Sequence, residues 1–155
     1  MTAGTAPGAV RADAQPRHPW TAGGEPSRLV VLAGVFLMTV IGAVHFAKAV
    51  DQFQPTEWYV GVLFYLNAAS ALLSVAGMAL SIPGAWTLGL AIAAPSFILY
   101  FVARGGWLPS YHADPSAVPS GLLAIAVELL FTLMYPLVAE AELRGLRRLV
   151  GRVSP

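Results

Sequence analysis

Four long apolar runs dominate this 155-residue chain and limit what it can fold into. They cover residues 29–50, 59–81, 85–103 and 121–139. At a rise of 1.5 Å per residue, a helix of about 19–23 residues matches the roughly 30 Å hydrocarbon core of a bilayer. The sequence therefore predicts an all-α integral membrane protein, namely a four-helix bundle with four spans and short loops.

The composition points to the same class. Hydrophobic residues make up 57% of the chain and charged residues 11%, whereas a soluble domain carries about 25% charged residues. Cysteine is absent, which excludes disulfides and thiol chemistry. The sequence has no phosphate-binding glycine loop, serine nucleophile elbow or basic nucleic-acid patch. The expected partner is therefore the lipid bilayer, and we expect no nucleic acid.

The segments that flank the spans differ in composition. Residues 1–28 are rich in proline, glycine and alanine, which predicts a disordered N-terminal tail. Residues 140–155 carry arginine and leucine at helical spacing. They predict a basic tail that continues the fourth span as a short amphipathic helix, either a simple anchor or a docking element. Pro95 and Pro136 lie inside spans and should kink or locally loosen those helices.

The alternative of a cleaved leader comes from Ala47-Lys48-Ala49, which fits a signal-peptidase site after an apolar run. That run is longer than the usual apolar core of a signal peptide, which has about 7–15 residues. The first span is therefore expected to be retained.

Positive charges predict the orientation of the spans. Cytoplasmic loops and tails of membrane proteins are enriched in lysine and arginine. Two arginine-rich groups flank the first and fourth spans, whereas only Lys48 and Arg104 lie at the opposite ends. The groups are Arg11, Arg17 and Arg28 before the first span, and Arg144, Arg147, Arg148 and Arg152 after the fourth. The prediction is a multi-pass protein of the cell membrane with both termini cytoplasmic.

Polar side chains gather in the outer half of the predicted bundle. Each span contributes one: His45, Asn67, Tyr100 and Glu128, with Arg104 one turn beyond Tyr100. We call these five residues the outer polar set. Glu128 lies about seven to eight residues from the outer end of its span, roughly 11 Å deep. An ionisable group inside a membrane costs about 2.5–3.5 kcal/mol on insertion scales and marks a candidate functional site.

Two interpretations of the outer polar set stay open. Glu128 could pair with Arg104 or His45 across the bundle, which would keep the carboxylate ionised. It could instead hydrogen-bond Asn67 or a serine and only hold helices together. A second pattern favours close helix contact, because small and polar residues form one helical stripe in the second span. The stripe consists of Asn67, Ser70, Ala71, Ser74 and Gly77.

Metal and cofactor sites have little support in the sequence. His45, His112 and Asp114 are weak metal candidates, because imidazole and carboxylate suit several divalent ions. No paired-histidine or His-Glu metal spacing is present. Haem with two histidine ligands would need a second histidine at the depth of His45, and the spans contain none. We therefore predict no cofactor.

Short motifs along the apolar part of the chain resemble a group of small four-span bacterial membrane proteins that are commonest in high-GC species. The motifs are Gly42-Ala43-Val44-His45, Asp51-x-Phe53, Glu57-Trp58, Tyr59-x-Gly61-x-x-Phe64, Arg104 before Gly106-Trp107-Leu108-Pro109, and Leu123 to Glu128-Leu129. The resemblance implies a four-span fold and a recurrent set of His, Arg and Glu side chains, without any particular activity. Relatives often carry Gly-Leu-Pro where this chain has Trp107-Leu108-Pro109. They also often carry a histidine where it has Gln52, and this departure weakens the case for a shared metal role.

Three functions are compatible with these patterns. The favoured one is an accessory or scaffold membrane protein that works through helix contacts, as a homodimer or in a larger membrane complex. The first alternative is a small transporter or binding protein for a proton, ion or small polar solute, which would use Glu128, His45 and Arg104. The second alternative is a quinone-linked redox module with Glu128 and His45 as proton acceptor and donor. On balance the sequence favours a protein that is not an enzyme.

Overall fold

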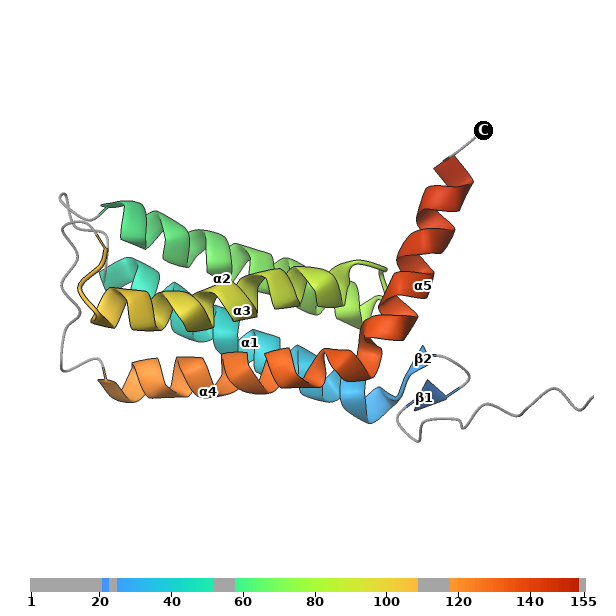
Figure 1. Cartoon of the computed structure of the whole chain (residues 1–155), viewed down its shortest axis with the longest axis horizontal. Coiled ribbons are helices and arrows are strands. Elements are labelled where there is room, and N and C mark those ends of the chain that lie inside the picture. Colours follow the sequence, from blue (N-terminus) through green and yellow to red (C-terminus); the bar gives the residue numbers. More distant parts are fainter. Residues whose placement is uncertain (1–20, 23–24, 52–57, 109–117, 154–155) are drawn as a thin grey trace, which may run out of the picture.

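The computed structural model describes residues 21–22, 25–51, 58–108 and 118–153, and these are almost entirely helical (Figure 1). The elements are β1 (Thr21–Ala22), β2 (Glu25–Pro26), α1 (Arg28–Asp51), α2 (Trp58–Ala79), α3 (Ala85–Arg104), α4 (Val118–Met134) and α5 (Pro136–Val153). The two short strands pair antiparallel, within the segment predicted to be a disordered tail. Of the remaining residues of this segment, Ser27 and Arg28 are described, and residues 1–20 and 23–24 lie outside the described part. Apart from this strand pair, the described residues confirm the prediction of an all-α fold.

Three helices are long and apolar enough to cross a membrane, namely α1, α2 and α3. The fourth candidate is the pair formed by α4 and α5, which qualifies only when both helices are taken together and is bent by 61° at the break. The described residues therefore contain three or four candidate membrane spans. Large apolar side chains on the outer surface, such as Leu32, Phe36, Leu72 and Leu133, also indicate a membrane protein.

The fourth apolar run differs from the expected single helix over residues 121–139. Helix α4 ends at Met134, and residues 136–139 belong to α5. The break follows from Pro136, which has no backbone N–H and is well suited to the first position of a new helix. The Tyr135 carbonyl then accepts a hydrogen bond from the N–H of Ala139, 3.0 Å away, at the start of α5.

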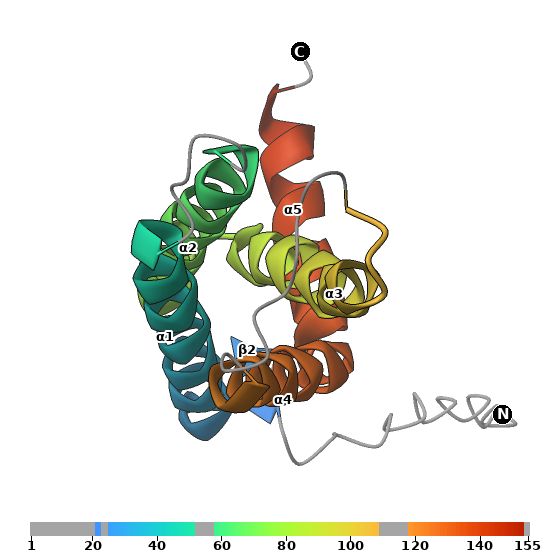
Figure 2. The ribbon, with the colours of Figure 1, turned by 90° about the vertical axis from the view of Figure 1, so that its left-hand side faces the viewer.

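Helices α1 to α4 lie side by side, and each contacts two of the others, so that they close a ring (Figure 2). Helix α1 contacts α2 and α4, and α3 contacts the same two helices from the opposite side. In the centre, Trp86 stacks on Phe131 with ring centroids 5.7 Å apart. Gly89 permits this packing, because a Cβ atom there would lie 2.6 Å from Cζ of Phe131.

The predicted small-residue stripe of α2 is used inside the chain. Ala71, Ser74 and Gly77 are buried, and the Ser74 hydroxyl donates a 2.8 Å hydrogen bond to the Ala85 carbonyl at the start of α3. A Cβ atom on Gly77 would lie 2.7 Å from the Cβ of Ala85. The stripe therefore provides the close contact of α2 with its own neighbours.

Helix α5 leaves the ring at an angle and is held to it by Glu142 (Figure 1). The N-cap of α3 is Gly84, which has no side chain to accept hydrogen bonds from the first turn. Oε1 of Glu142 accepts them instead, from the N–H groups of Trp86 at 3.1 Å and Thr87 at 3.2 Å. A carboxylate in this position also complements the positive end of the helix dipole. Glu142 thereby ties α5 to α3.

Candidate binding site

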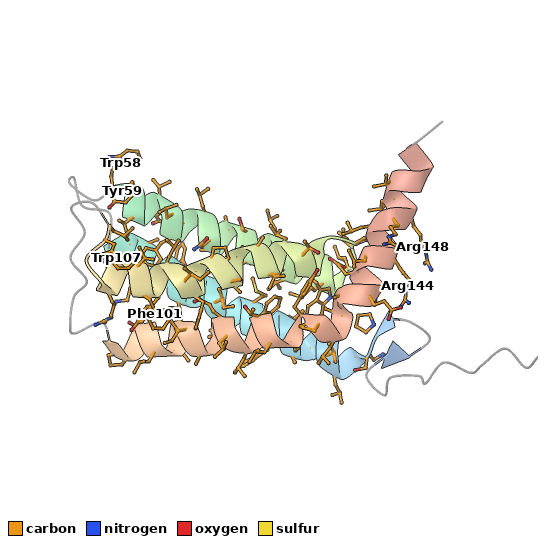
Figure 3. The ribbon with its side chains drawn as sticks, in the orientation of Figure 1. Trp58, Tyr59, Phe101, Trp107, Arg144 and Arg148 are labelled. Atoms are coloured by element: carbon orange, nitrogen blue, oxygen red, sulfur yellow. The ribbon has the colours of Figure 1, made fainter. Side chains whose placement is uncertain are left out.

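A cavity of about 170 Å³ lies among α1, α2, α3 and α4. It is near the end of the ring where α1 and α3 finish and where α2 and α4 begin. All five members of the outer polar set line it, namely His45, Asn67, Tyr100, Arg104 and Glu128. In Figure 3 the labelled aromatic residues Trp58, Tyr59 and Trp107 mark this end of the molecule. The ring therefore brings together residues that are far apart in the sequence.

His45 of α1 and Glu128 of α4 are the most deeply buried polar groups of the cavity. His45 is 4% exposed and Glu128 is 2% exposed. Nε2 of His45 lies 3.6 Å from Oε1 of Glu128, so His45 is the nearer of the two partners proposed from the sequence. This pair connects the first and fourth helices of the ring.

The protonation of His45 is constrained by its second nitrogen. Nδ1 lies 2.9 Å from the carbonyl oxygen of Ile41. Because a carbonyl only accepts hydrogen bonds, Nδ1 must carry a proton and donate it. Nε2 then faces Glu128, and a favourable contact between them requires one more proton, either on the imidazole or on the carboxyl group.

Asn67 contacts a serine that the sequence analysis did not select. Its Nδ2 atom donates a 2.9 Å hydrogen bond to Oγ of Ser96, across the contact between α2 and α3. Ser96 also lines the cavity. One signal could have identified it, because Ser96 lies one helical turn before Tyr100 and so shares its face of α3. Asn67 is therefore engaged with Ser96, whereas the sequence had suggested Glu128 as its partner.

Tyr100 and Arg104 interact with each other, one turn apart on α3. The guanidinium carbon of Arg104 lies 5.5 Å from the centroid of the Tyr100 ring, which is within the range of a cation–π contact. Arg104 is exposed, and the structure records no ion pair between it and Glu128. Gly121 lets the Tyr100 ring approach α4, because a Cβ atom there would lie 2.6 Å from Cε2 of the ring.

Most of the remaining cavity wall is apolar. It includes Val44, Val60, Leu63, Phe64 and Leu99. The Phe64 ring lies 5.4 Å from the His45 ring, centroid to centroid. Apolar walls with a few convergent polar groups are typical of small-molecule binding sites. For comparison, an engineered protein cavity of about 150 Å³ holds one benzene molecule. The site thus has room for a molecule of about one ring.

The metal candidates of the sequence analysis are only partly placed. His112 and Asp114 lie outside the described residues, so only His45 of that set has a position. Within the described ranges, no three or more histidine, aspartate and glutamate side chains come close enough to hold a metal ion. The His45–Glu128 pair by itself supplies two possible ligand groups.

The fold and this cavity define a class of protein, a helical protein with three or four candidate membrane spans in its described part and a polar site between them. Comparisons of the chain with protein-family models, curated proteins and solved structures gave no match. What the site does is therefore argued from its geometry.

Proposed function

We propose that α1 to α4 cross the cell membrane as a four-helix bundle with both termini in the cytoplasm. Helix α4 has 17 residues, about 26 Å of helix, which is at the lower limit for a span. The ends of the ring differ in character (Figure 3): Trp58, Tyr59 and Trp107 lie at one end, and Arg144 and Arg148 lie beyond the other. Aromatic residues are enriched at membrane interfaces and arginines on the cytoplasmic side.

We further propose that the protein binds a small solute in the cavity of the outer polar set. One observation carries this proposal: a polar or ionisable side chain from each of four helices reaches the same cavity, 170 Å³ in volume. Buried ionisable groups are expensive in a membrane and are mostly retained where they serve a site. The His45–Glu128 pair is therefore best explained as the polar end of a binding site.

The cavity favours a neutral ligand that both donates and accepts hydrogen bonds. Inside the cavity His45 and Glu128 already face each other. The two cations of the lining, Lys48 and Arg104, contact Asp51 and the ring of Tyr100. Burying a charge without a partner costs far more than burying a hydrogen-bonded polar group. Asn67, Ser96 and Tyr100 offer hydroxyl and amide groups along the wall. A ring-sized molecule with one hydroxyl group, a class that includes phenols, matches this lining.

The scaffold function favoured by the sequence receives less support from the packing. Its basis was the small size of the chain, its short loops and the small-residue stripe of α2, and that stripe contacts α1 and α3 of the same chain. Gly42 of α1, for example, faces Ala71, whose Cβ would lie 3.3 Å from an added Cβ. The stripe therefore does not require a partner protein.

The test uses three probes that share a benzene ring and differ in charge: phenol, benzoate and benzylamine. Thermal unfolding of the full chain in detergent is followed with each probe. Phenol should raise the unfolding midpoint more than the two ions do, by an amount equivalent to about 1.4 kcal/mol at ten times its dissociation constant. Glu128→Gln should weaken this shift, whereas Glu140→Gln, a change at an exposed site on α5, should preserve it. Equal shifts in both variants would contradict the proposal.

A further inference from the structure

A second cavity, of about 500 Å³, lies at the other end of the ring. It is formed where α5 crosses the ends of α1, α2 and α3, with Pro26 of β2 at its edge. Its floor includes Met78 and Trp86, which are buried core residues. Gly145 lets α5 approach the turn before α3, because a Cβ atom there would lie 3.1 Å from Cβ of Pro83. This cavity shares no lining residue with the solute cavity.

Arginines of α5 line this cavity on one side. Arg144 and Arg148 are one turn apart and both contribute to it, and both are labelled beside α5 in Figure 3. Arg147 is absent from the lining, as expected from its position about 100° around the helix from Arg148. Two guanidinium groups on one wall favour an anion, and arginine is well suited to bind phosphate in a bidentate manner.

The carboxylates near the cavity are engaged elsewhere. Glu142 lines it, but its Oε1 accepts hydrogen bonds from the N–H groups of Trp86 and Thr87. Glu140 lies outside the lining and pairs with Arg144, with Oε1 2.6 Å from Nη1. Arg148 is thus the principal cation for an incoming anion, supported by Arg144.

The apolar side of α5 identifies the source of that anion. Leu143, Leu149 and Val150 are 45–68% exposed and lie about 100–160° around the helix from Arg144 and Arg148. A helix with basic and apolar sides that is bent away from a bundle is typical of one that lies in the membrane interface. At that depth the available anions are phospholipid head groups, and basic pockets beside spans on the cytoplasmic side bind them.

We propose that the cavity beneath α5 binds the phosphate head group of an anionic phospholipid, with Arg148 as its main contact. The inference rests on the proposed membrane embedding but not on the solute cavity. A charged head group bound in this cavity would then influence the contact between α5 and α3 that Glu142 makes.

The experiment measures thermal unfolding of the full chain in detergent with three additives: dihexanoyl phosphatidylglycerol, dihexanoyl phosphatidylcholine and inorganic phosphate. Phosphatidylglycerol should raise the midpoint, and the other two should not. Arg148→Gln should raise the concentration needed for half of this effect about five-fold. Arg147→Gln removes the same charge from the same helix away from the cavity and should leave that concentration unchanged. Arg148→Lys should retain part of the effect.

Three results would overturn the inference. An equal shift with phosphatidylcholine would show that the head-group charge is irrelevant. An equal shift with inorganic phosphate would show a free-anion site rather than a lipid site. Equal losses in Arg147→Gln and Arg148→Gln would show diffuse attraction without a cavity. Since phenol binding depends on the other cavity, failure here leaves the proposed solute site intact, and failure there leaves this one intact.

Discussion

His45 on α1 and Glu128 on α4 face each other at 3.6 Å inside the chain, with both side chains almost wholly buried. The two residues lie on the first and last helices of the ring, so their approach depends on closure of that ring. Without the other residue, Nε2 of His45 and the carboxyl group of Glu128 would each be buried without the polar partner that the structure gives them. The pair is therefore a sensitive probe of both the fold and the site.

Replacing either member of this pair alone should destabilise the protein strongly. His45→Leu and Glu128→Leu should each lower the free energy of unfolding by about 1–3 kcal/mol, because each leaves the other buried polar group without its partner. The double variant should lose clearly less than the sum of the two. A coupling energy of about 1 kcal/mol or more in a double-mutant cycle is the expected result.

The matched cycle uses Arg104, the other partner suggested by the sequence. Arg104 lies over the ring of Tyr100, so Arg104→Leu and Glu128→Leu should be additive within about 0.5 kcal/mol. Strong coupling of Glu128 to Arg104, together with additivity to His45, would contradict the arrangement of the site.

Glu142→Ala should destabilise the junction between α5 and α3. The variant leaves two N–H groups at the start of α3 without their acceptor, and hydrogen bonds to a charged group contribute about 1.5–3 kcal/mol. The loss in unfolding free energy should fall in that range. Glu140→Ala removes a carboxylate only two residues away, from an exposed pair with Arg144, and should cost at most about 0.5 kcal/mol. Similar losses in both would argue against the capping role.

The contrast between Glu128 and Glu142 shows which parts of the site and fold could be predicted from the sequence. A carboxylate in the middle of an apolar run stands out by composition alone, and so did the other members of the outer polar set. Glu142 lies in a charged segment that is typical of a solvated tail, so nothing nearby marks it as buried. Its partner, the first turn of α3, is more than fifty residues earlier. Such a contact depends on tertiary packing, which local patterns do not contain.

The end of α4 differs from the predicted range of the fourth span for a related reason. Pro136 was expected to kink a continuous span, but hydropathy alone does not show whether a helix bends or restarts. The structure restarts it with a 61° change of direction, because Glu142 and Gly145 give α5 a place to pack against the turn before α3. The helices α1, α2 and α3, with their long apolar sequences and clear boundaries, differ from the predicted ranges by only one or two residues.

Gly89→Ala should disturb the core where α3 meets α4. The added methyl group would lie 2.6 Å from Cζ of Phe131 and 2.9 Å from Oγ of Ser74, and overpacking of this kind costs about 1–3 kcal/mol. Gly151→Ala in α5 meets no atom within 4 Å and should be neutral, or stabilising by up to about 1 kcal/mol. Unfolding curves of the two variants check this prediction, and a neutral Gly89→Ala would contradict the close packing.

Reporter fusions test the proposed topology. Two reporter enzymes are used, one that works only in the cytoplasm and one that works only after export. After Pro155 the cytoplasmic reporter alone should be active, and between α3 and α4 the exported reporter alone should be active. The reason is that four spans return the chain to the side on which it started, with the arginine-rich ends in the cytoplasm. If α4 did not cross the membrane, both reporters would be found on the same side.

The central claim is a solute site among α1, α2, α3 and α4. It is tested most directly by filling the cavity with a larger apolar side chain while its ionisable residues stay unchanged. Ala124 lines the cavity, whereas Ala126 on the same helix is exposed and absent from the lining. Equilibrium binding of phenol is measured for the parent protein, Ala124→Leu and Ala126→Leu. The account predicts saturable binding that Ala124→Leu weakens at least ten-fold, about 1.4 kcal/mol, and that Ala126→Leu leaves unchanged. Binding that is equal in all three proteins, or absent from the parent, would contradict it.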